Sequence, residues 1–277
     1  MRHRPTRGDT RATDRPHLLR EIALVTAMFA LYKAGRLLTA DRTEDAFRNA
    51  DLVRRGEQAL HLPDEAVIQH LLVQVEPVIK AANTYYAAVH FPAAALFLGW
   101  LWLRRPGQYR RARTMLALLT GAGLAVHLLF PLAPPRLAAT GMIDTGRVYG
   151  PTVYGAAPDS DHLANQYAAM PSLHFGWALL IAVLLIAAGR TRARWLWLLH
   201  PALTLLVIVG TANHYWLDSL VAAALVGAVT LPLWAPARRP APLARRATPL
   251  PPAPASAPAS APEPFRRPAP AGGRSAA

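Results

Sequence analysis

Long apolar segments separated by short polar ones dominate the first 235 residues of the chain. A helix that crosses a membrane needs about 20 mostly apolar residues, and six segments fit that length. They predict helices over residues 20–38, 84–103, 114–131, 172–189, 195–212 and 215–234. We therefore expect an all-α, polytopic membrane protein built as a six-helix transmembrane bundle.

The segment 66–83 has a different pattern. Its polar residues Gln69, Glu76, Lys80 and Asn83 are spaced seven, four and three apart, which places them on one stripe of a helix. This pattern predicts an additional amphipathic helix, lying at the membrane interface or against the bundle. Within it, Glu76 and Lys80 are expected to form an i,i+4 ion pair.

Both ends of the chain differ in composition from the middle. Residues 1–19 are rich in arginine, which predicts a basic cytoplasmic N-terminus followed by an uncleaved first membrane helix. Residues 236–277 consist mainly of Pro, Ala, Ser and Arg, and such a segment buries too little apolar surface to fold. It predicts a disordered cytoplasmic tail, which leaves residues 20–235 as the membrane domain.

Net charge raises the question of a partner. The chain has 30 Lys and Arg against 16 Asp and Glu, a formal charge of +14, which suits nucleic acid or an anionic membrane surface. Its arginines gather at the ends and in short connections, whereas a nucleic-acid groove interleaves them with aromatic residues. This distribution excludes nucleic acid and predicts the bilayer and a membrane lipid as partners.

There are no cysteines, so disulfides and thiolate chemistry are excluded.

The arginine-rich connections also predict an orientation. Short connections rich in arginine, here 104–113 and 190–194, stay in the cytoplasm. With the N-terminus on the same side, the connections 39–83 and 132–171 and the turn at His214 are expected on the outer side. We therefore expect an integral protein of the cell (plasma) membrane whose polar site lies on the extracytoplasmic face.

The start of the last apolar segment carries the first candidate site. His214 and Asp218 are four residues apart, which places them on one helix face. The carboxylate can accept a hydrogen bond from one ring nitrogen and leave the other as a basic nucleophile. The alternative interpretation is a His–Asp pair that only caps a helix or satisfies a buried polar cluster.

A second candidate segment, Met170–His174, directly precedes another apolar helix. Pro171 suits a helix start, Ser172 can cap it, and the unpaired N–H groups of a helix N-terminus bind phosphate. His174 can then protonate a leaving oxygen and later take a proton from an incoming hydroxyl. The alternative is an ordinary capped helix with a histidine at the interface.

Further phosphate contacts are expected from three residues. Arg136 follows two prolines at the end of an apolar segment, where its guanidinium can hold a phosphate in a bidentate manner. Thr211 and Asn213, beside His214, can add hydrogen bonds. An isolated interfacial arginine also serves topology or lipid headgroups, and packing at a helix end equally explains the other two.

Three motifs thus occur in order: Pro-Pro-Arg ending at Arg136, Pro-Ser-Leu-His ending at His174, and His-x-x-x-Asp from His214 to Asp218. This ordered set resembles the type 2 phosphatidic acid phosphatase superfamily. It is most similar to the inositolphosphotransferase branch, which contains inositol phosphorylceramide synthase. The resemblance covers roughly residues 20–235, and three motifs in order are far more specific than any one alone.

The resemblance implies a role for each residue. His214 would be the nucleophile, Asp218 would orient it, and His174 would handle the leaving group. Ser172 and Arg136 would bind the phosphate. The implied protein is a metal-independent lipid phosphate phosphatase or headgroup phosphotransferase, without a cofactor, that works through a phosphohistidine.

The chain also departs from the wider superfamily. The position six residues before His214, usually an arginine, is Ile208. No lysine precedes Arg136, and Leu173 stands where glycine is usual. These departures fit the inositolphosphotransferase-like branch and leave the phosphate site with fewer cations.

Two other kinds of protein remain open. One is a non-catalytic lipid-phosphate-binding transporter or scaffold, and the other is a metal-dependent hydrolase with His174, His214 and Asp218 as ligands. The chain lacks the Gly-x-Ser-x-Gly elbow, the His-Glu-x-x-His motif and the P-loop. A serine hydrolase, a zinc protease and a nucleotidase are therefore without support. His90 and His127 could be proton or substrate contacts, although a hydrogen-bonded histidine within the bundle is the commoner outcome. The aspartates of the connection 132–171 could contact a polar headgroup or only be solvated: Asp144, Asp159 and Asp161.

Overall fold

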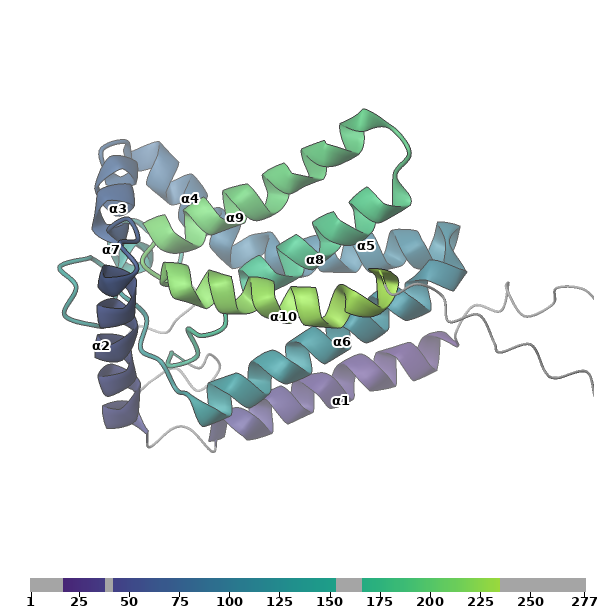
Figure 1. The fold of residues 1–277 in the computed structure, drawn as a ribbon, viewed down its shortest axis with the longest axis horizontal. Coiled ribbons are helices and arrows are strands. Elements are labelled where there is room, and N and C mark those ends of the chain that lie inside the picture. The colour runs from purple at the N-terminus through teal and green to yellow at the C-terminus, as the bar shows by residue number, and fades with distance from the viewer. Residues whose placement is uncertain (1–16, 38–41, 153–165, 235–277) are drawn as a thin grey trace, which may run out of the picture. The chain divides into compact units, whose positions relative to one another are not determined.

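The computed structural model describes residues 17–37, 42–152 and 166–234 (Figure 1). These residues are helical and contain no strand, which confirms the all-α fold class. The elements are α1 (Leu18–Leu37), α2 (Thr43–Ala59), α3 (Glu65–Val73), α4 (Glu76–Ala88), α5 (His90–Arg104), α6 (Pro106–Leu129), α7 (Thr145–Tyr149), α8 (Leu173–Ala188), the 3-10 helix η1 (Arg192–Leu198), α9 (Leu199–Gly210) and α10 (Trp216–Trp234). The predicted tail 236–277, nearly all of the predicted N-terminus 1–19, Asp159 and Asp161 lie outside the described residues.

Two described helical segments are long and apolar enough to cross a membrane by themselves. They are α6 and the continuous pair η1–α9, with α4 and α5 as a third if that bent pair counts as one span. The helices α8 and α10 are apolar over shorter lengths. Length and composition therefore support two or three spans where the sequence pattern predicted six.

The helix predicted over 84–103 is present, but it is bent near its start. The chain is helical on both sides of Val89, but α4 and α5 meet there at an angle of 50°. Pro92 lacks the N–H group that a continuous helix would bond to the carbonyl of Ala88, and its ring crowds that carbonyl. The bend places His90 at the start of α5, beside the end of α4.

The single amphipathic helix predicted over 66–83 is wrong, because the segment forms α3 and α4 with a break between them. Pro77 in the first turn of α4 cannot donate a hydrogen bond back to α3. The polar stripe is divided accordingly. Gln69 and Asn83 are buried, whereas Glu76 and Lys80 form the predicted i,i+4 ion pair on the surface, with 2.6 Å between Oε1 and Nζ.

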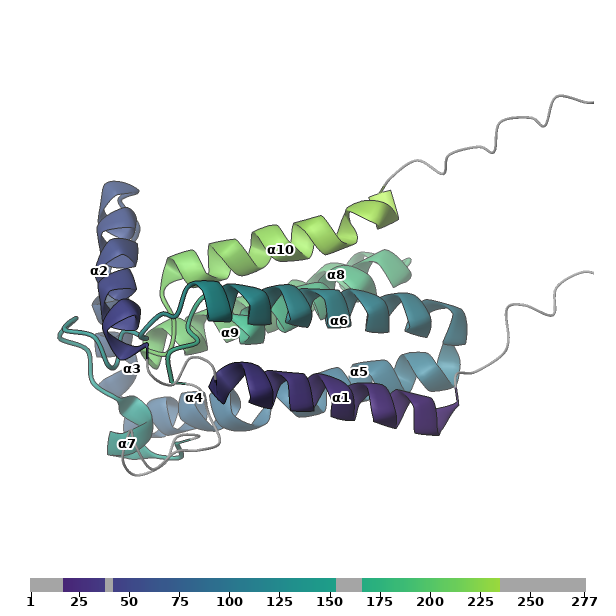
Figure 2. The same cartoon turned by 90° about the horizontal axis from the view of Figure 1, so that it is seen from below.

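The helix α2 lies in a segment that the sequence pattern treated as a connection. It crosses one end of the long helices (Figures 1 and 2). Its buried positions recur at helical spacing on one face: Ala46, Asn49, Ala50, Val53 and Glu57. That face packs on the segments that lead into α8 and α10, through Leu132, Ala133, Ala169 and Tyr215.

The helix α8 packs against α5, α6, α9 and α10. One cluster of buried residues joins α6, α8 and α10 through Met115, Leu119, Leu180 and Val226. The start of α8 approaches α6 closely, because a Cβ atom at Gly123 would lie 2.6 Å from Cδ2 of Leu173. Glycine at position 123 therefore permits the contact that fixes the first turn of α8.

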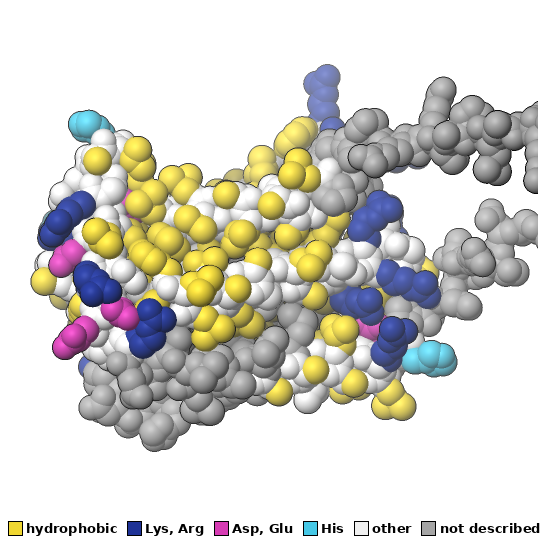
Figure 3. Space-filling model, turned by 60° about the horizontal axis from the view of Figure 1, so that its bottom comes forward, with side chains coloured by type: hydrophobic (Ala, Val, Ile, Leu, Met, Phe, Trp, Pro, Cys, Tyr) yellow, Lys and Arg dark blue, Asp and Glu magenta, His cyan; other side chains and the backbone are white. Residues whose placement is uncertain are grey.

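Hydrophobic side chains cover much of the long helices' outer surface (Figure 3). Large exposed examples are Leu96, Leu103, Leu118, Leu129, Leu220 and Leu231. In Figure 3, charged side chains gather at the two ends of this surface. A wide apolar band with charges at its ends suits a bundle that is surrounded by lipid.

Candidate active site

The first turn of α8 brings one predicted segment into place. Ser172 caps the helix, with its Oγ accepting a hydrogen bond from Phe175 N at 3.3 Å, as its position in the sequence predicted. Ser172 N donates to the carbonyl of Asp218 at 3.2 Å. This backbone hydrogen bond ties the Pro-Ser-Leu-His segment directly to the start of α10.

The turn between α9 and α10 brings in the other segment. After α9 ends at Gly210, Ala212 has a positive φ of 58°, and the N–H groups of Asn213 and His214 both bond to the carbonyl of Ile208. Because α10 begins at Trp216, His214 precedes the helix instead of sharing its face with Asp218.

The predicted hydrogen bond between His214 and Asp218 nevertheless forms. The carboxylate reaches back from the first turn of α10, with 3.2 Å between Asp218 Oδ2 and His214 Nδ1. The same Nδ1 lies 2.8 Å from the carbonyl oxygen of Ala169. Since a carbonyl and a carboxylate only accept hydrogen bonds, Nδ1 must carry the proton. The other ring nitrogen, Nε2, then has a lone pair and no hydrogen-bond partner among the described residues.

Burial keeps this imidazole neutral. The ring of His214 is nearly inaccessible to solvent, and desolvation lowers its pKa to about 4. The Ala169 carbonyl opposes this shift, and the positive charge of Arg136 adds to it. At neutral pH the ring is therefore an uncharged base with its lone pair on Nε2.

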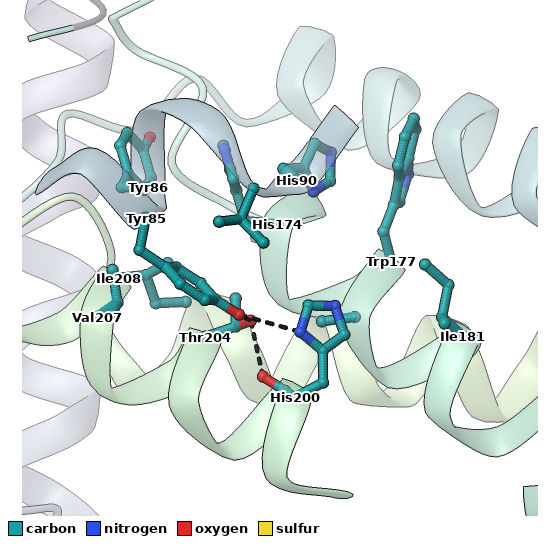
Figure 4. A pocket seen from close by; sticks show the side chains of 12 residues that line it. Tyr85, Tyr86, His90, His174, Trp177, Ile181, His200, Thr204, Val207 and Ile208 are labelled. Carbon is teal, nitrogen blue, oxygen red and sulfur yellow. Dashed lines mark hydrogen bonds between the residues drawn. The ribbon is translucent and has the colours of Figure 1, made fainter. Parts of the chain in front are cut away.

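His174 lies on the other side of the site. Its ring centroid is 6.2 Å from that of His214, so the fold brings the two predicted histidines together. Stacking fixes the His174 ring between Tyr86 and His90, each with its centroid 4.4 Å away (Figure 4). His90 in turn stacks on Trp177 at 4.3 Å. For His90 the sequence left open a proton or substrate contact and a histidine within the bundle. Its place in this stack depends on the bend at Val89.

The three remaining predicted residues form one hydrogen-bonded network beside His214. Arg136 donates from Nε to Asn213 Oδ1 at 3.1 Å, and its Nη1 pairs with Asp144 Oδ2 at 3.2 Å. Asn213 Nδ2 donates to Thr211 Oγ1 at 2.9 Å, and Thr211 donates to the carbonyl of Val207 at 2.7 Å. Arg136 and its neighbours are thus at the site, but internal partners engage their polar atoms.

The connection between α6 and α8, which supplies Asp144, is held by two residues of the predicted polar stripe. Gln69 makes two hydrogen bonds with the backbone of Ile143, at 2.9 and 3.0 Å. Asn83 exchanges hydrogen bonds with Thr145, whose side chain is fully buried. Asp144 itself caps α7. These contacts fix the ion pair between Asp144 and Arg136.

His127 reaches the site from α6. Its Nε2 lies 3.2 Å from the carbonyl of Pro171, to which it must donate, while the buried Nδ1 has no partner among the described residues. For His127 the sequence left open a proton or substrate contact and a hydrogen-bonded histidine within the bundle. The structure instead shows it holding the backbone directly before Ser172.

Sequence reasoning missed two acidic residues. Glu57 in α2 and Glu65 in α3 accept hydrogen bonds from the backbone at the start of α10. The helical spacing of small and apolar residues in α2 is a signal that could have identified Glu57 as buried. No local signal in the sequence indicates that it lies beside His214 and Asp218.

A small cavity opens beside His174, lined by residues of α4, α5, α8 and α9 (Figure 4). Its volume of about 10 Å³ suits a single water molecule. Tyr85 connects two residues of its wall, with its hydroxyl 3.0 Å from His200 Nδ1 and 2.9 Å from Thr204 Oγ1. The cavity is therefore a small, mainly apolar space beside His174, with the polar groups of Tyr85, His200 and Thr204 in its wall.

The described residues contain no group of three or more His, Cys, Asp or Glu side chains arranged to hold a metal ion. His174, His214 and Asp218 therefore do not form a ligand set of the kind required by the metal-dependent alternative. His214 instead shares a hydrogen bond with Asp218, and its ring lies 6.2 Å, centroid to centroid, from that of His174.

The fold and the site together define a helical membrane protein with a histidine–aspartate pair at one end of its bundle. The chain belongs to the PAP2 superfamily, whose family model matches residues 51–231. Members of this superfamily are generally phosphatases or phosphotransferases that act on phosphoesters, which supports an enzymatic role. No curated protein and no solved structure matches the chain.

Proposed function

We propose that this protein is an integral membrane phosphotransferase or phosphatase that acts on lipid-linked phosphoesters through a phosphohistidine at His214. The observation that carries the proposal is the pair of acceptors on Nδ1 of His214, the Asp218 carboxylate and the Ala169 carbonyl. They hold the ring in one tautomer and orientation, as an in-line nucleophile requires.

In the first step, Nε2 of His214 attacks phosphorus, so a P–N bond forms while the P–O bond to the leaving group breaks. His174 enters this step as the imidazolium, whose charge the anionic substrate stabilises, and it gives its ring proton to the departing oxygen. In the second step, His174 takes a proton from an acceptor hydroxyl, whose oxygen attacks phosphorus and breaks the P–N bond. Asp218 stabilises the positive charge that His214 carries in the intermediate. Water as the acceptor gives hydrolysis, and an alcohol gives transfer.

The charges around the site favour a phosphodiester substrate. Arg136 is the only buried arginine in the part of the chain that the structure describes, and Asp144 already balances its charge. Arg147, the other cation near Asp144, is partly exposed. Ile208, where the superfamily usually has arginine, is buried and apolar. A monoanionic diester therefore suits this site better than a dianionic monoester, in keeping with the inositolphosphotransferase-like branch.

A lipid screen tests this substrate preference. Purified protein in mixed micelles is offered lipid phosphodiesters and lipid phosphomonoesters, each with and without added hydroxyl acceptors, and the products are resolved by mass spectrometry. We expect diesters to turn over at least about tenfold faster than monoesters. Formation of a new diester when a hydroxyl acceptor is added would identify a transferase. Release of free headgroup phosphate would identify a phosphatase. Faster turnover of monoesters would contradict the charge argument.

We also propose that six helical segments cross the plasma membrane: α1, α4–α5, α6, α8, η1–α9 and α10. Support comes from the arginines at one end of the bundle, where α5 passes into α6 and α8 passes into η1. At the opposite end, His174 lies in the first turn of α8 and His214 lies between α9 and α10. The site would then face the extracytoplasmic side.

Cysteine labelling tests this topology, because the native chain has no cysteine. Gln74 lies between α3 and α4 and Gln108 begins α6, and both side chains are exposed. We expect Gln74→Cys to react with a membrane-impermeant maleimide on intact cells and Gln108→Cys to react only after permeabilisation. The reverse pattern would invert the proposed orientation.

A further inference from the structure

The first turn of α10 presents three successive backbone N–H groups, and each meets a different carboxylate. The donor–acceptor pairs are Tyr215 N to Asp218 Oδ2 (2.9 Å), Trp216 N to Glu65 Oε1 (3.4 Å) and Leu217 N to Glu57 Oε1 (2.9 Å). N–H groups at a helix start have no backbone carbonyl partner within the helix, and the positive end of the helix dipole favours the carboxylates. Residues from three separate elements thus converge on the segment that follows His214.

Of the two acceptors outside α10, Glu57 is the more deeply buried. Its residue is 5% exposed, and its side chain shares a hydrogen bond with that of Glu65. Two carboxyl groups in such contact hold a proton between them, because two adjacent negative charges repel strongly. Burial raises the pKa of Glu57 to about 8, and the neighbouring Glu65 adds to this shift while the Leu217 N–H opposes it.

The surroundings of the pair add further negative charge. Asp218 of α10 acts on Glu57, and both glutamates act on the buried hydroxyl of Tyr215. Arg54, on α2, is the cation that acts on the same hydroxyl. With one proton, the pair carries one negative charge. Loss of that proton would give the pair a second negative charge, close to Asp218 and in a site that must accept an anionic substrate.

We propose that Glu57 and Glu65 are positioning residues for the proposed nucleophile: as a pair that shares one proton, they clamp the first turn of α10 and so hold Asp218 against His214. This inference rests on the proposed function of His214. The clamp acts through the backbone of residues 216 and 217, which lies between the catalytic histidine and its carboxylate partner. When the pair loses its proton, repulsion from Asp218 opens the clamp.

The inference predicts the alkaline limb of the pH profile. Wild-type kcat is expected to fall above pH 8, to about one tenth of its plateau at pH 9. The amide of Glu57→Gln keeps an oxygen that accepts from Leu217 N and an N–H group that donates to Glu65, so it mimics the protonated pair. This variant should therefore retain its plateau value of kcat at pH 9. Glu57→Ala removes the acceptor, and kcat should fall about 10- to 100-fold at pH 7 with little change in KM. Glu76→Gln, in the exposed ion pair with Lys80, serves as the matched control and should follow the wild-type profile.

Thermal unfolding in detergent gives a readout that needs no activity. Because the folded-state pKa of Glu57 lies above its usual 4.5, its contribution to stability is complete below pH 4.5 and is lost as pH rises through about 8. The melting temperature of the wild type should therefore fall between pH 6 and 9. Glu57→Gln should lose less over that range, by a difference of a few degrees.

The outcomes separate this inference from the proposed function. An alkaline limb that is identical in the wild type and Glu57→Gln would overturn the clamp, even where His214→Ala abolishes turnover. Equal melting temperatures of these two proteins at pH 9, after equal values at pH 6, would also overturn it. Full turnover by His214→Ala would instead refute the role of His214 as the nucleophile. The unfolding experiment would still test whether Glu57 and Glu65 form a protonated pair.

Discussion

Replacing His214 by alanine is expected to lower turnover by at least about 10⁴-fold, because the nucleophile and its P–N intermediate are both lost. The ring is buried, and two acceptors hold its Nδ1 so that Nε2 alone is available for attack. Turnover is measured with the preferred lipid diester in mixed micelles. His70→Ala, which changes an exposed histidine of α3, is the matched control and should retain wild-type turnover.

Two outcomes would count against the catalytic role of His214. Unchanged turnover by His214→Ala would show that chemistry occurs elsewhere in the chain. Binding of lipid phosphates without turnover by the wild type would favour the transporter or scaffold. A His214→Ala protein that unfolds at the wild-type temperature separates loss of chemistry from loss of the fold.

Replacing His174 by alanine should lower turnover of natural lipid esters by about 10²- to 10⁴-fold, the usual contribution of a general acid. The loss should depend on the leaving group. With a p-nitrophenyl phosphodiester, whose leaving group departs without a proton, bond cleavage should fall less than tenfold. This split follows from the position of His174 across the site from His214, where it is held by stacking with Tyr86 and His90.

Equal losses on the lipid ester and the p-nitrophenyl ester would contradict proton transfer by His174. Such a result would indicate that the ring only packs against Tyr86 and His90. His70→Ala again controls for the change from histidine to alanine, because His70 lies on α3 with its side chain exposed.

The sequence predicted most of the site because its residues lie at helix ends. Ser172 was expected to cap α8, and its hydroxyl does accept a hydrogen bond there. His174 and His214 are 40 positions apart, yet the predicted orientation of the helices placed both at the same end. The contact between His214 and Asp218 could be predicted from their spacing alone. The predicted geometry was different, because the carboxylate extends back from the first turn of α10 to a histidine that precedes the helix.

Other features depend on contacts between distant parts of the chain. The carboxylate of Glu57 bonds to a backbone group 160 positions away, and that of Glu65 to one 151 positions away, so local periodicity gives no sign of either. The bend at Val89 and the break before α4 were readable in principle from Pro92 and Pro77, but apolar continuity outweighed the prolines in the prediction. The hydrogen bond to Asn213 and the ion pair with Asp144 that engage Arg136 likewise depend on how the connection between α6 and α8 folds.

The central claim is that His214 becomes covalently bound to phosphorus. Its most direct test is rapid quenching of the enzyme during turnover of a labelled lipid diester, followed by peptide mapping under alkaline conditions that preserve phosphohistidine. We predict a phosphorus adduct on His214 that is absent from His214→Ala. An adduct on a different residue, or none in samples quenched during proven turnover, would contradict the account.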